Sequence, residues 1–235
     1  HLNRFYLCPP GKAIQPLRIT KYGRPDLMNA ASQADLILIA PSAFLPALHE
    51  YRQYREQNSG ITVKMAAVED IMNQFSYGLN DPTAIRDFLK FAYENYPAPA
   101  PSAVLLVGDG NYDFENNLAT ATADLLPPYI HPYDSTASDD NYVYFGLYGL
   151  LDSDTSYYQP DRGYDMMIAR WPVKSVSELN TVMNKIRNYE SSSNFGPWRA
   201  TVTLVADDEI GTYDTESFHT RQTEELQRYH LPAAF

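Results

Sequence analysis

Acidic side chains gather at the ends of apolar runs and in the long segment between two of those runs. The candidates are Asp109, Asp139, Asp140, Asp165, Asp207 and Asp208. The run SAVLLV has the composition of a buried parallel strand and is followed at once by Gly108-Asp109-Gly110. The carboxyl edge of such strands is the usual ligand side of an open α/β fold, and hard cations prefer oxygen ligands. We therefore predict a cation site, with calcium as the expected ion, at Asp109, Asp139 and Asp140.

Each of these carboxylates also has a structural interpretation, which stays open at this stage. It could cap a helix, accept hydrogen bonds from loop backbone, or pair with Arg170. The run DSDTS at residues 152–156 superficially resembles an EF-hand loop. However, Tyr157 stands where that loop requires glycine, and Gly163 stands where it requires glutamate. We exclude an EF-hand.

Residues for nucleophilic catalysis are scarce. Cys8 is the only cysteine, so the chain can form no internal disulfide and no thiolate zinc cluster. Cys8 lies in a short strand-like run that ends at Pro9-Pro10, with no acid–base partner nearby in the sequence to lower its pKa. We interpret it as a small apolar residue.

Glu216 and His219 form a second candidate site. They lie one turn apart on a helix predicted over about 216–229, so they share a face and could point into a cleft above the sheet. In the alternative interpretation, Glu216 only complements the positive end of the helix and His219 is an ordinary histidine. The sequence favours neither interpretation.

Composition and charge narrow the class of protein. The net charge of −11 argues against duplex nucleic acid and anionic membranes as partners, because both require a basic surface. Apolar residues make up 44% of the chain, which argues against disorder, and no apolar stretch reaches the roughly 18 to 20 residues of a membrane span. Since the chain begins at His1 without an initiator methionine or a signal sequence, we expect a processed or excised piece.

Strand-like and helical segments alternate along the chain. Strands are predicted at 34–40, 61–68, 102–107, 166–169 and 201–206, helices at 41–57, 81–96, 175–190 and 216–229, and a hairpin near 142–151. This alternation indicates βαβ units and therefore a mainly parallel sheet with helices on both faces. We predict a lead-in segment at 1–31, a first subdomain at 32–192 and the start of a second at 193–235.

Several pieces of sequence occur in an order that resembles the gingipain-like cysteine peptidases of family C25. They are ADLILIAPSAF, VEDIMNQFSYGLNDPTAIRDFLKFAYENY, AVLLVGDGNYDF, ASDDNYVYFG, DMMIARWPV and VADDE. Residues 204–226, LVADDEIGTYDTESFHTRQTEEL, are most similar to the branch of sortases that serves bacterial type IX secretion. The resemblance implies a caspase-like fold.

The resemblance also implies a site and a substrate. The family uses a histidine in a Gly-His-Gly-like motif and a cysteine on a later strand, and neither motif is in this chain. We therefore expect the dyad after Phe235 and an inactive isolated chain. The family's calcium binding supports the cation site, and its pocket for a basic side chain implies a substrate contact from Glu216, with His219 on the same helix face as the second expected contact. No organic cofactor is implied.

The expected partners are a protein or peptide substrate carrying the C-terminal signal of secreted cargo, and the remainder of the chain's own catalytic domain. The expected location is the bacterial outer membrane surface. The alternative is a non-catalytic calcium-binding or protein-interaction domain of caspase-like topology. A nucleotide-binding fold fits poorly, because only the lone Gly108-Asp109-Gly110 is present where a G-x-G-x-x-G would be needed.

Overall fold

The chain forms two compact units in a computed structural model, one from His1 to Leu179 and one from Asn180 to Phe235. The structure describes residues 23, 25–113, 117–118, 124–130, 135–145, 163–191, 193, 195–206 and 218–232. The division between the units falls inside a helix, whereas the subdomain boundary predicted at 192 stays a prediction. None of the described helices is long and apolar enough to cross a membrane.

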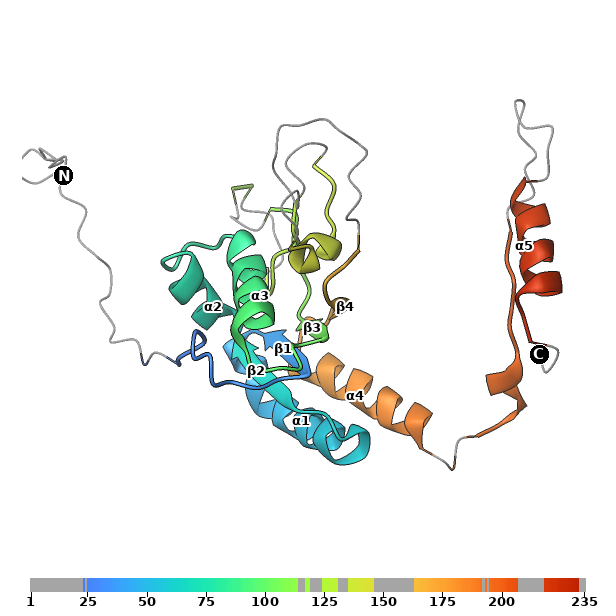
Figure 1. Cartoon of the computed structure of the whole chain (residues 1–235), viewed down its shortest axis with the longest axis horizontal. Coiled ribbons are helices and arrows are strands. Elements are labelled where there is room, and N and C mark those ends of the chain that lie inside the picture. The colour runs from blue at the N-terminus through green and yellow to red at the C-terminus, as the bar shows by residue number, and fades with distance from the viewer. Residues whose placement is uncertain are drawn as a thin grey trace, which may run out of the picture. The chain divides into compact units, whose positions relative to one another are not determined.

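A four-stranded parallel sheet forms the centre of the first unit (Figure 1). Its strands are β1 (Leu36–Ala40), β2 (Val63–Ala67), β3 (Ala103–Val107) and β4 (Met167–Trp171), in the spatial order β2-β1-β3-β4. Leu38 of β1 pairs with Met65 on one side and Leu105 on the other, and Leu105 pairs with Ala169. Because all neighbours are parallel, the carboxyl ends of the four strands meet at one edge, as expected from the alternation of strands and helices.

Helices α1 (Leu45–Ser59), α2 (Val68–Phe75) and α3 (Thr83–Asn95) cover the sheet, with α2 and α3 on one face and α1 on the other (Figure 1). Ile37 and Ile39 of β1 belong to the core on the side of α2 and α3, while Leu38 between them is also fully buried. Successive side chains of a strand point to opposite faces, so a strand covered on both faces must be apolar throughout. The unbroken apolar runs in the sequence have this cause.

Local capping interactions mark the ends of three helices. Gly60 ends α1 in the left-handed conformation, with φ of +65°. A side-chain oxygen of Asp81 accepts a hydrogen bond of 2.9 Å from the backbone N–H of Thr83 at the start of α3. Before α4 (Val176–Glu190), Ser175 Oγ accepts from the N–H of Glu178 at 3.2 Å. The Glu178 carboxylate accepts from the N–H of Lys174 at 2.7 Å.

The second unit contains the 3₁₀ turn η4 (Pro197–Ala200) and helix α5 (Phe218–Tyr229). The guanidinium of Arg199 lies 4.1 Å from the ring centre of Phe195, 4.5 Å from that of Tyr189 and 5.0 Å from that of Trp198. These distances are within the range of cation–π attraction. The cluster gives this small unit a local packing centre.

One predicted strand is wrong, one predicted hairpin is tested only in part, and one helix was not predicted. Residues 201–206 form no strand, although their pattern is strand-like, because no described residue pairs with them; Val205 is 86% exposed. Within the predicted hairpin, residues 142–143 belong instead to the 3₁₀ turn η2 (Asp139–Val143), and residues 146–151 lie outside the described part. Helix α2 has eight residues, too few for its periodicity to separate it from the preceding apolar strand.

Candidate functional site

The turn after β3 requires both of its glycines. Gly108 has φ of +148°, a conformation that side chains other than glycine rarely adopt. A Cβ added to Gly110 would lie 2.7 Å from the carbonyl oxygen of Leu126 and 2.9 Å from Cδ of Pro128. The backbone N–H groups of Leu125 and Leu126 both donate to the carbonyl oxygen of Asp109. Residues 124–128 thus pass directly over the end of the strand.

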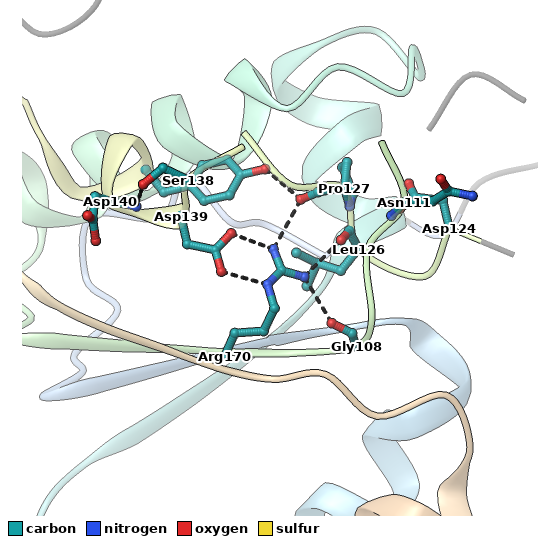
Figure 2. A network of polar contacts seen from close by, with 10 residues as sticks. Gly108, Asn111, Asp124, Leu126, Pro127, Ser138, Asp139, Asp140 and Arg170 are labelled. Atoms are coloured by element: carbon teal, nitrogen blue, oxygen red, sulfur yellow. Dashed lines mark hydrogen bonds and ion pairs between the residues drawn. The ribbon is translucent and has the colours of Figure 1, made fainter. Parts of the chain in front are cut away.

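Arg170, in β4, ties this edge of the sheet together (Figure 2). Its Nε and Nη2 donate to the two carboxylate oxygens of Asp139 at 2.6 and 2.7 Å. Nη1 donates to the carbonyl oxygens of Gly108 and Leu126, both at 2.9 Å, and Nη2 also donates to that of Pro127 at 3.2 Å. All five N–H groups of the guanidinium have an acceptor. We call this set of contacts the Arg170 network.

Tyr142 adds a further contact to the Arg170 network. Its hydroxyl donates to the carbonyl oxygen of Pro127 at 2.7 Å, so this oxygen receives two hydrogen bonds. The side chain is fully buried, its ring meets that of Tyr129 edge-on at 5.6 Å, and burial raises the pKa of Tyr142 well above its ordinary value. Tyr142 therefore stays a neutral donor at physiological pH.

Two of the three predicted cation ligands line one small pocket at this edge. The pocket has a volume of about 220 Å³, and its walls include Asp109, Asp139, Ser138 and Arg170. Arg170 binds both carboxylate oxygens of Asp139, and Nζ of Lys174 lies 3.3 Å from Oδ2 of Asp109. Each carboxylate thus has a protein cation beside it, which is the pairing that the structural interpretation foresaw for Asp139.

The other acidic candidates lie elsewhere. Asp140 is exposed and accepts a hydrogen bond of 3.2 Å from the hydroxyl of Tyr164, whose pKa it raises. Asp165 accepts from the N–H of Phe145 at 2.7 Å. Among the described residues, no three His, Cys, Asp or Glu side chains come together as metal ligands. Asp207 and Asp208 lie outside the described part, and calcium binding stays a prediction.

Of the second predicted pair, the structure describes only one member. Glu216 lies outside the described residues. His219 is exposed on α5 and lines a groove of about 540 Å³ together with Val205, Gln222 and Leu226. His219 also accepts, through its carbonyl oxygen, a hydrogen bond of 2.7 Å from Thr223 Oγ1. Whether Glu216 faces this groove stays a prediction, as does the role of Cys8, which is likewise outside the described part.

A second cleft, which the sequence did not indicate, lies beside α2. It has a volume of about 310 Å³, and its polar walls come from Glu69, Asn73, Asn80 and Asp124. Asp124 Oδ1 accepts from the N–H of Asn111 at 2.9 Å, and burial raises the pKa of this carboxyl. Asp124 lies in a segment without periodicity, so only the tertiary contact reveals its environment.

Known proteins were compared with the chain. The model of Peptidase family C25 matches residues 29–234. Among the solved structures that match is the crystal structure of dimeric latent PorU from Porphyromonas gingivalis, with a TM-score of 0.56 and 26% sequence identity. The match covers 76% of this chain and 18% of the PorU chain. No curated protein sequence matches.

The match to PorU confirms the predicted α/β architecture of caspase-like type, with a parallel sheet and helices on its faces. The family match extends from the loop before β1 to the end of α5. It therefore includes the pocket beside Asp109 and Asp139, the cleft beside α2 and the groove beside His219. The chain belongs to peptidase family C25, a family of cysteine peptidases.

Proposed function

We propose that this chain is part of a C25 cysteine peptidase of the sortase type, which cleaves the C-terminal signals of type IX secretion cargo at the bacterial outer membrane surface. The observation that supports this proposal most is the match of the family over residues 29–234 together with the likeness to PorU. The matched region spans 18% of the PorU chain.

The chain contributes the scaffold of the catalytic domain, and other residues of the protein contribute the catalytic pair. None of the five histidines is flanked by glycine, and Cys8 precedes the whole sheet in sequence. A thiolate attacks a peptide carbonyl only where an acid–base group is positioned beside it. The chain alone therefore does not cleave peptides, and the remainder of the catalytic domain is its first partner.

Substrate contact falls to Glu216 and His219 in this proposal. The groove beside His219 is open and combines apolar side chains such as Leu226 with the polar Gln222. An extended peptide with a basic side chain would match a carboxylate at Glu216, and calcium at the acidic sheet edge would hold neighbouring loops in place.

An activity assay tests the proposal. The substrates are peptides that end in a cargo signal. The chain is assayed alone, and then as part of a longer protein that also contains the family segment with the Gly-flanked histidine and the cysteine. We expect cleavage only from the longer protein. In that protein, Glu216→Gln should lower kcat/KM for a substrate with a basic cleavage site, and the loss should correspond to about 2 to 5 kcal/mol of transition-state stabilisation. The kcat/KM for neutral cleavage sites should stay nearly unchanged.

Two results contradict parts of the proposal. Cleavage by the chain alone that disappears in Cys8→Ser would show that the chain has its own nucleophile. If the longer protein folds but cleaves nothing, the alternative of a non-catalytic calcium-binding or protein-interaction domain is favoured. Equal small losses on basic and neutral sites would assign Glu216 to the helix end instead of the substrate pocket.

A further inference from the structure

We draw no further inference here: the strongest candidate, the patch of exposed aromatic side chains that Tyr189, Phe195 and Trp198 form around the guanidinium of Arg199 in the second unit, carries no proposal because nothing in the structure shows what covers it.

Discussion

Replacement of Arg170 by methionine should destabilise the first unit by about 3 to 5 kcal/mol, the range observed when one partner of a buried ion pair is removed. Methionine keeps an unbranched apolar stem and removes every donor. Both carboxylate oxygens of Asp139 and the carbonyl oxygens of Gly108 and Leu126 then lose a hydrogen bond. Pro127 keeps the donor of Tyr142.

Burial decides the magnitude. The side chains of Arg170 and Asp139 are only 14% and 24% exposed, so water screens the pair weakly and cannot readily replace the lost donors. Because Asp139 keeps some access to water, we expect the lower half of the range. A domain of this kind has a total stability of roughly 5 to 15 kcal/mol, so the loss is a large share of it.

Urea unfolding, followed by far-UV circular dichroism and by tryptophan fluorescence, measures the loss. With a slope of about 1 to 3 kcal/mol per molar urea, the midpoint should fall by at least roughly 1 M. Arg52→Met is the control, because Arg52 forms a partly exposed pair with Glu56 that is expected to contribute about 0 to 1 kcal/mol. Arg170→Lys should remain clearly destabilising, since an ammonium cannot reproduce the five fixed donors of the guanidinium.

The reasoning is refuted if Arg170→Met lowers stability by no more than Arg52→Met does. It is also refuted if Arg170→Lys is as stable as the native chain, because the fork geometry would then be unimportant. A double-mutant cycle with Asp139→Asn separates the ion pair from the three carbonyl contacts.

Three further predictions concern the same edge of the sheet. Gly110→Ala should destabilise the chain by about 1 to 3 kcal/mol in urea unfolding, because its Cβ would lie 2.7 Å from the carbonyl oxygen of Leu126; an unchanged midpoint would contradict the close approach. Burial raises the pKa of Asp124 in the folded state, so its charge lowers stability above that pKa. Asp124→Asn should therefore stabilise the chain at pH 7, and the gain should shrink as the pH falls through the folded-state pKa; a gain independent of pH would exclude titration as the cause. If Asp109 and Asp139 belong to a calcium site, millimolar calcium should raise the melting temperature, and magnesium at the same concentration should raise it less. An unchanged melting temperature would show that these two carboxylates only form their ion pairs with Lys174 and Arg170.

The sequence by itself determined the main elements of the first unit. The apolar runs LILIA and AVLLV have the length and composition of strands covered on both faces. The end of α1 at Gly60 and the start of α3 near Asp81 are set by local backbone and side-chain chemistry. These features depend on neighbours in sequence, which is why they could be predicted. The ordered motifs also determined the family, which the comparison confirmed.

The tertiary structure decided the partners of the acidic side chains. Asp139 and Arg170 are 31 residues apart, and only the adjacency of β3 and β4 with residues 124–128 above them brings the pair together. The sequence predicted Asp139 as an acidic ligand and gave no sign of Asp124. A strand-like pattern at 201–206 likewise forms no strand where the described residues offer no neighbour. Hydrogen-bond partners and buried charges arise between distant segments, so the fold decides which partner each carboxylate has.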